Sequence, residues 1–321
     1  MTMKTIVAKV VDRGRALATG ERKRSKNPWV LVAALVLFLG SGIFAFKELP
    51  SIDSPPRWWM LVLAGAVGVP AIAVLNSLEY RMMGKLVGHR VGCWDAMRVT
   101  IVASAANLLP IPGAAVVRME GLRRGGARVS HAFNATVVIG LAWLGTTAVI
   151  AGGVQVIARP WFALAFVASG IALLAGAWGL TVRARGMVYA TQTLGRLVVV
   201  ETGFVLVHGS KLFLTAHALH LRCSPAQAIS LTAAAVVASA AGLLPGGLGL
   251  REALAAALAP AIGMPAAVGL VITAVDRVVS LIALTILAVI VLTFERRHRA
   301  RHPAAEPVAT ADSRPAPEAV S

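Results

Sequence analysis

Two pairs of oppositely charged neighbours lie inside apolar stretches of the C-terminal half of this chain. Arg251 and Glu252 follow the glycine-rich sequence LLPGGLGL, and Asp276 and Arg277 lie near the middle of the apolar segment 264–294. A charge at the centre of a membrane helix costs about 2.5–3.5 kcal/mol on insertion scales, so it is retained where it is paired, hydrated or used. An arginine beside a helix break is suited to an anion, because unpaired backbone N–H groups and the helix dipole also attract negative charge.

The composition indicates an integral membrane protein. Of the 321 residues, 57% are hydrophobic and 14% are charged, against about 25% charged residues in soluble domains. The net charge of +17 comes from basic residues at segment ends and in loops, which indicates membrane topology and not nucleic-acid binding. Cys93 and Cys223 lie far apart without a metal-ligand pattern, so we expect reduced packing residues, no metal and no cofactor.

Runs of about 20 apolar residues, long enough to cross a bilayer, recur along the chain. They predict an all-α polytopic membrane protein with about six full spans and two re-entrant helical hairpins. Basic residues flank the first and last spans, so we expect both termini in the cytoplasm and the protein in the inner membrane. The predicted spans are 27–46, 58–78, 129–158, 160–182, 197–220 and 264–294, and the predicted hairpins are 99–117 and 223–250.

The domain organisation follows from these segments. Residues 1–26 are expected to form a basic cytoplasmic segment, residues 27–297 the transmembrane domain, and residues 298–321 a disordered cytoplasmic tail. We expect the first apolar run to be retained, because a long basic stretch precedes it and no small-residue cleavage site follows it.

The first hairpin is predicted from a conflict between charge and topology. If residues 99–117 crossed completely, the basic cluster 118–128 would lie outside, against the positive-inside rule. The sequence NLLPIPG, 107–113, interrupts this run, because prolines remove backbone donors and break helices. Lipid cannot satisfy the freed backbone groups, so the break implies a surrounding of protein or a water-filled cavity.

An internal repeat connects this break with the glycine-rich one. SAANLLPIPGAAVVR, 104–118, is similar to SAAGLLPGGLGLR, 239–251, although chance similarity in so biased a chain is an alternative. The two units, about 58–158 and 197–294, would be inverted in the membrane, and paired interrupted segments of this kind point to a transporter's substrate site. The residues expected to make the breaks are Pro110, Pro112 and Gly113 in the first copy, and Pro245, Gly246, Gly247 and Gly249 in the second.

Polar side chains recur on one face of the segment 197–220. They could line a head-group pathway, or Glu201 and His208 could couple movement to protons. The alternative, which we favour for Glu201, places Glu201 at the cytoplasmic interface and lets the Lys211 ammonium reach the membrane surface. Five residues fall within roughly 80° of one another on a helix: Glu201, Phe204, His208, Lys211 and Thr215.

The motif LLPGGLGLRE, 243–252, resembles the flippase-like family named after the transmembrane region of lysylphosphatidylglycerol synthases. NLLP at 107–110, Arg118 and the later Asp276–Arg277 pair extend the resemblance over about 26–297. It implies a two-repeat membrane domain that moves, or helps to move, polar-headed lipids between leaflets. In the first copy this chain has two alanines, 114 and 115, where the family often has Gly-Glu. With no large soluble domain after the last span, tRNA-dependent aminoacyl transfer is not expected.

The resulting hypothesis is a lipid translocase without catalytic residues, since no hydrolase, nucleotide-binding or zinc-protease motif is present. Its partners would be lipids with anionic or zwitterionic head groups; a lipid-synthesis enzyme and a second copy of the chain are left open as further partners. The alternatives are a membrane transferase acting on a phospholipid or polyprenyl phosphate, a scaffold of a lipid-synthesis complex, and simple pairing of Arg251 and Glu252 with a neighbouring helix. The residues expected to bind substrate are Arg251, Glu252, Arg118, Asp276, Arg277, Lys211, His208 and Asn107.

Overall fold

A computed structural model describes residues 55–106, 113–241 and 249–301, and these ranges contain helices and short connections without a strand. The predicted first span, 27–46, the basic segment 1–26 and residues 302–321 of the predicted tail lie outside the described residues. The helices are α3 (Trp58–Leu63), α4 (Val69–Leu86), α5 (Cys93–Ala106), α6 (Gly113–Arg124), α7 (Val129–Gly153), α8 (Pro160–Arg185), α9 (Met187–Ala218), α10 (Pro225–Ala241), α11 (Leu250–Leu258) and α12 (Ala266–Arg301), with a π-helical turn η1 (Ala64–Gly68) and a 3₁₀ turn η3 (Pro260–Ile262).

Among the described residues, five helical segments are long and apolar enough to cross a membrane, and each overlaps a predicted span. Large apolar side chains point outward from them; in α12, Val278, Ile282 and Ile286 are all more than half exposed. Such a surface fits lipid and not water. The chain is therefore a multi-pass membrane protein. The five segments are Trp58–Leu86, Val129–Gly153, Pro160–Arg185, Met187–Ala218 and Ala266–Val291.

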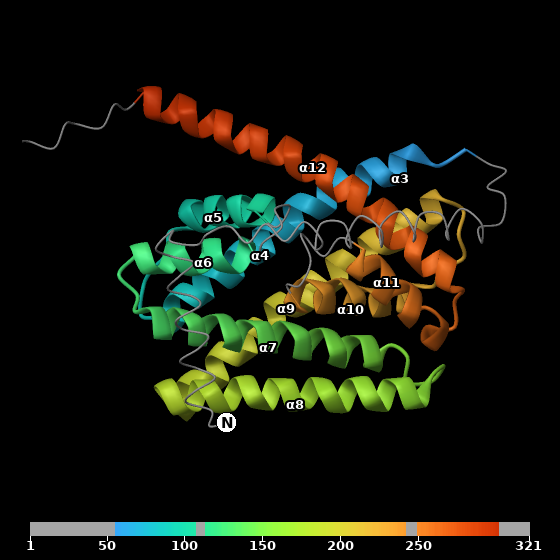
Figure 1. Ribbon diagram of the computed structural model, residues 1–321, viewed down its shortest axis with the longest axis horizontal. Coiled ribbons are helices and arrows are strands. Elements are labelled where there is room, and N and C mark those ends of the chain that lie inside the picture. The colour runs from blue at the N-terminus through green and yellow to red at the C-terminus, as the bar shows by residue number, and fades with distance from the viewer. Residues whose placement is uncertain (1–54, 107–112, 242–248, 302–321) are drawn as a thin grey trace, which may run out of the picture.

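Two pairs of shorter helices pack as antiparallel arms. In the first pair, Val99 of α5 lies against Gly121 of α6. In the second, the Gln227 side-chain amide at the start of α10 donates to the carbonyl oxygens of Ile262 and Gly263, just after α11. The chain therefore reverses direction between the arms of each pair, which excludes a straight crossing by residues 99–117 (Figure 1).

Residues 107–112 and 242–248, which connect the arms of the two pairs, lie outside the described residues. Gly113 begins α6, and Gly249 precedes α11 with φ of 75°, a left-handed conformation that glycine adopts without a Cβ penalty. α12 continues to Arg301, past residue 297, where the transmembrane domain was predicted to end. The predicted break and site residues outside the described ranges are Asn107, Pro110, Pro112, Pro245, Gly246 and Gly247.

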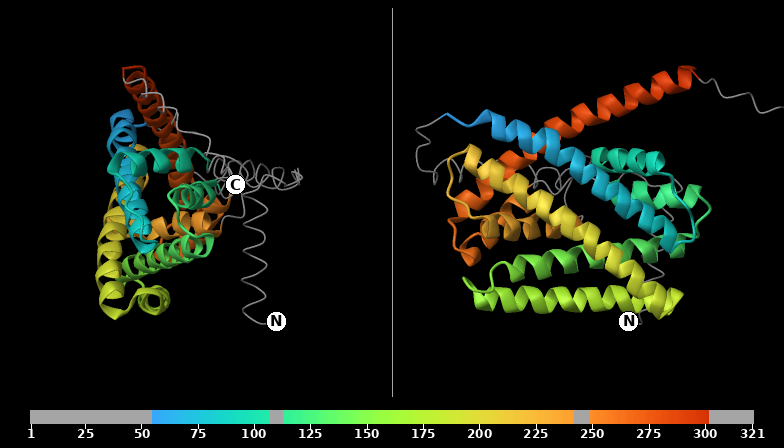
Figure 2. Two further views of the ribbon diagram at one scale, coloured as in Figure 1. Left: turned by 90° about the vertical axis from the view of Figure 1, so that its left-hand side faces the viewer. Right: turned by 180° about the vertical axis from the view of Figure 1, so that it is seen from behind.

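Helix α9 connects the two halves of the bundle. Leu197, near its first third, is buried in a cluster with residues of α4 to α8, whereas Leu212, near the end of the helix, is buried with residues of α10 to α12. At about 1.5 Å per residue its 32 residues extend about 48 Å, longer than the hydrocarbon core of a bilayer. Figure 2 shows α9 running obliquely past α4 and the shorter helices. Helix α9 thus contributes side chains to both of these buried clusters.

Helices α7 and α8 form an outer layer on the side of the bundle opposite α12 (Figure 1). Their backbones touch at Gly145 and Gly170, where a Cβ added to Gly170 would lie 2.7 Å from the Gly145 carbonyl oxygen. Small residues permit this approach, and close packing is a main source of helix association in lipid.

We expect Gly170→Leu to lower the free energy of unfolding by about 1–3 kcal/mol, because the added side chain must push the two backbones apart. Gly179→Leu is the matched control, since a Cβ at Gly179 of the same helix meets no atom within 4 Å. Thermal unfolding of the purified protein in detergent measures the difference. Equal stability of the two variants would contradict the close contact.

Candidate functional site

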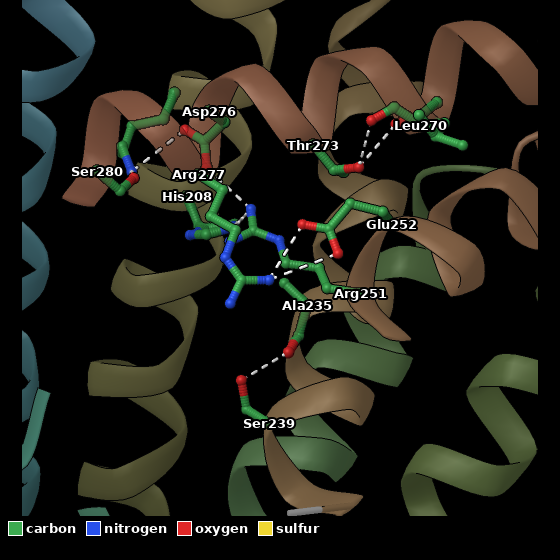
Figure 3. A network of polar contacts seen from close by, with 12 residues as sticks. His208, Ala235, Ser239, Arg251, Glu252, Leu270, Thr273, Asp276, Arg277 and Ser280 are labelled. Carbon is green, nitrogen blue, oxygen red and sulfur yellow. Dashed lines mark hydrogen bonds and ion pairs between the residues drawn. The ribbon is translucent and has the colours of Figure 1, made fainter. Parts of the chain in front are cut away.

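The two charged pairs singled out in the sequence lie on facing helices. Each residue of one pair forms an ion pair with a residue of the other. Arg251 of α11 donates from Nη2 to Asp276 Oδ2 of α12 at 2.8 Å, and Arg277 of α12 donates from Nη1 to Glu252 Oε1 of α11 at 3.1 Å. Both carboxylates are fully buried. Figure 3 shows the two guanidinium groups between these carboxylates. Arg251 and Glu252 thus pair with a neighbouring helix, which is the alternative that the sequence analysis left open.

Local sequence explains why α11 and α12 meet so closely. Gly269 of α12 lies on the α11 backbone, where an added Cβ would come within 2.8 Å of the Ala255 carbonyl oxygen. The amphipathic sequence LREALAAAL of α11 turns Glu252 and Ala255 inward together. Positions 251 and 252 point in directions about 100° apart on a helix, so the two residues reach different partners on α12.

Helix α9 adds a third cation to this group. Lys211 places Nζ 3.2 Å from Asp276 Oδ1 and donates to Ser280 Oγ at 2.6 Å, so Asp276 faces two cations. His208 Nε2 lies 3.2 Å from Nη2 of Arg251. We call these residues the α11–α12 cluster: His208, Lys211, Arg251, Glu252, Asp276, Arg277 and Ser280.

The alternative in which the Lys211 ammonium reaches the membrane surface does not hold. The Lys211 side chain is 3% exposed, and its Nζ lies 3.2 Å from Asp276 Oδ1. The room for its stem comes from Gly68 in the π-helical turn, where an added Cβ would lie 2.5 Å from the Cγ and Cδ atoms of Lys211. Pro70 follows this turn, and its missing N–H removes a regular helical hydrogen bond there. Gly68 is a site residue that the sequence analysis missed; its only signal was the sequence GVP in an apolar helix.

The α11–α12 cluster carries more positive than negative charge. Lys211, Arg251 and Arg277 face two carboxylates, which leaves a formal charge of +1 when His208 is neutral. The Arg251 side chain is 15% exposed, more than those of its charged partners, and its buried Nε has no hydrogen-bond partner in the described parts of the chain. The cluster therefore has an unused donor and a charge that an anion would balance.

Arg118 does not join the α11–α12 cluster. It donates from Nη1 to Glu79 Oε1 of α4 at 2.9 Å, and the Tyr80 hydroxyl donates to its backbone oxygen at 3.3 Å. As with Arg251, the buried Nε of Arg118 has no hydrogen-bond partner within the described ranges. Within the described residues, Arg118 and Arg251 thus share two features: the guanidinium of each donates to a carboxylate, and the buried Nε of each has no hydrogen-bond partner.

Two carboxylates near Arg118 were misjudged from the sequence. Glu79 lies just beyond the predicted span 58–78, but it is a buried residue of α4. Glu201 was placed at the cytoplasmic interface, but its side chain is 1% exposed and interacts electrostatically with Glu79 and Arg118, so that placement is wrong. We call Glu79, Arg118 and Glu201 the α4–α6–α9 cluster. Its members come from three separate helices, which no local sequence pattern could bring together.

The fold and these clusters define a polytopic helical membrane protein with paired charges buried between a helical hairpin and long spans. The family model described as the lysylphosphatidylglycerol synthase TM region matches residues 182–288. This match confirms the resemblance over residues 182–288. The matched segment contains the whole α11–α12 cluster but not the first copy of the repeat. Searches of curated proteins and of solved structures gave no significant match.

We expect Asp276→Asn to lower the free energy of unfolding by about 3–5 kcal/mol, because it leaves Lys211 and Arg251 without their shared carboxylate. Adding Lys211→Met should recover part of this loss, since one uncompensated buried charge is removed. Denaturant unfolding in mixed micelles measures both effects.

Glu120→Gln is the control for this pair of variants. Glu120 binds Arg123 at 2.7 Å on an exposed part of α6, and the hydrogen bond from that guanidinium lowers the pKa of Glu120 to about 2. Exposed pairs contribute little, so the transition of this variant should match that of the wild type. An unshifted transition in Asp276→Asn would contradict the account of the buried cluster.

Proposed function

We propose that this protein is a lipid translocase that moves a phospholipid or another polar-headed lipid between the leaflets of the cytoplasmic membrane. The family match supports a function in membrane lipid handling. The single observation that carries the finer proposal is Arg251, a guanidinium fixed by a buried carboxylate, with a net positive surrounding and an Nε donor that has no partner among the described residues. A phosphate ester is the lipid group that this arrangement suits best, because arginine binds phosphate through several directed N–H groups.

In this proposal the α10–α11 and α5–α6 pairs are re-entrant hairpins that enter the membrane from opposite faces. Arg251 would bind the head-group phosphate, Asp276 and Glu252 would hold Arg251 and Arg277 in place, and Arg118 would offer a matching site in the first repeat. His208 and Lys211 would border the head group on α9. The repeated motif and the carboxylate-bound arginine near each copy support this arrangement.

We expect Arg251→Ala to slow the exchange of a labelled phospholipid between leaflets of proteoliposomes by about tenfold or more, the effect of losing one charge-assisted hydrogen bond. The variant should fold, because Asp276 keeps its ion pair with Lys211. Arg123→Ala, which removes an exposed arginine on α6, is the matched control and should exchange lipid at the wild-type rate.

An exchange rate that Arg251→Ala leaves unchanged would remove Arg251 from the mechanism. A wild-type protein that moves no lipid would contradict translocation itself, and consumption of a lipid donor with release of a product would favour the transferase.

The proposed orientation places the start of α5 in the cytoplasm. Cys93 is exposed there, whereas Cys223 is buried in the connection before α10, where burial raises the pKa of its thiol to about 11 and suppresses the reactive thiolate. A membrane-impermeant maleimide should therefore label Cys93 only after the membrane is made permeable, and Cys223 in neither state. Cys93→Ser is the control that abolishes labelling. Labelling of Cys93 in intact cells would overturn the orientation.

A further inference from the structure

Glu201 is a buried acidic residue that lies outside the α11–α12 cluster. Its side chain lies near the middle of α9, it is 1% exposed, and its buried Oε1 has no hydrogen-bond partner among the residues that the structure describes. A buried carboxylate that is ionised and unpaired costs several kcal/mol, on the order of the penalty for any isolated ion in a protein interior. Because the ionised form of Glu201 would carry this cost, we expect a ligand to neutralise its carboxylate.

The surroundings of Glu201 supply too little positive charge. Arg118 is the cation that acts on it, and the Nη1 group of Arg118 already binds Glu79 at 2.9 Å. Counted over the part of the chain that the structure describes, one guanidinium thus faces two carboxylates, which leaves a formal charge of −1 in the α4–α6–α9 cluster. The excess is opposite to the +1 of the α11–α12 cluster.

Both clusters are attached to the same face of α9. Glu201 and His208 are seven residues apart, about two turns or 10 Å along the helix. Phe204 lies between them and stacks on the His208 ring, with 5.7 Å between centroids and 9° between planes. α4, which carries Glu79, packs along α9, and Gly203 contacts Leu75 at this place (Figure 2). A change of charge at Glu201 therefore acts on a helix that contacts Arg251 directly through His208.

We propose that the α4–α6–α9 cluster is a proton-binding site, with Glu201 as the group that takes up and releases the proton. Glu201 Oε1 forms an O–H bond with a proton from water and returns the proton to water; no other bond is made or broken. The charged or titratable groups that face it are Glu79 on α4 and Arg118 on α6, with His208 further along α9. A proton at Glu201 makes this cluster neutral, and an anion at Arg251 does the same for the other cluster.

The coupling of the two sites rests on the proposed translocase function, whereas the proton site itself does not. Proton binding at Glu201 and phosphate binding at Arg251 would each remove an excess charge from opposite ends of one helical face. We therefore expect lipid exchange to depend on pH through Glu201.

The proton site is tested by infrared difference spectroscopy of the full chain in phosphatidylcholine vesicles during a pH titration. The wild type should show the carbonyl stretch of a protonated carboxyl group that disappears as the pH rises. Glu201→Gln should lose this titrating band and Glu120→Gln, which changes an exposed carboxylate, should keep it. If Glu201→Gln fails to fold, the same pH titration of Glu201→Asp tests the proposal. The shorter side chain at the site must shift the pH midpoint of the carbonyl band. A band that Glu201→Gln leaves intact, or an unshifted midpoint in Glu201→Asp, would overturn the proposal.

The coupling is tested by exchange of a labelled phospholipid in vesicles of phosphatidylcholine and phosphatidylglycerol at several pH values. Glu201→Gln should abolish the pH dependence that the wild type and Glu120→Gln share. A pH dependence retained in Glu201→Gln would overturn coupling through this residue. Absence of protein-dependent exchange in the wild type would contradict the proposed function, while the infrared band would still report the proton site.

Discussion

The structure depends on one constraint: charges that lie inside an apolar bundle must be balanced by other charges of the same bundle. Asp276 meets this constraint at the centre of the protein, where it accepts from Arg251 and attracts Lys211. Its position decides which helices meet, because those two cations come from α11 and α9. Removal of one partner of a buried ion pair lowers the stability of the folded protein far more than the intact pair raises it. The charges therefore specify the arrangement of the helices more than they stabilise it.

The balance is incomplete in two places, and there the structure connects to function. One cluster has one positive charge too many and the other has one negative charge too many, and both contain buried donors or acceptors without partners in the described residues. Buried polar groups in proteins are almost always satisfied, so these exceptions point to ligands. An anion on one side and a proton on the other are the simplest ligands that complete both sites.

Sequence reasoning identified the charged residues of the α11–α12 cluster and the reversal of the chain, but it misjudged residues whose role depends on a distant partner. Arg251, Glu252, Asp276 and Arg277 stood out because charges inside apolar runs are rare. Glu201 was assigned to the membrane surface, and a surface position was left open as an alternative for Lys211, since a charge near a span end is ordinary when no partner is known. The sequence GVP was the only signal for Gly68, because its role is to leave space for the side chain of Lys211, which is distant in the sequence.

The sequence by itself determined the class of the protein, the positions of the long apolar helices and the places where the chain turns back. These properties follow from composition, segment length and helix-breaking residues, which act locally. Only the tertiary structure decided that Arg118 binds Glu79 and not the residues near Arg251, and that Asp276 is shared between two helices. The reason is that an ion pair depends on a separation of a few ångströms between side chains that are 25 to 65 positions apart in the chain, and that separation is set by the packing of whole helices.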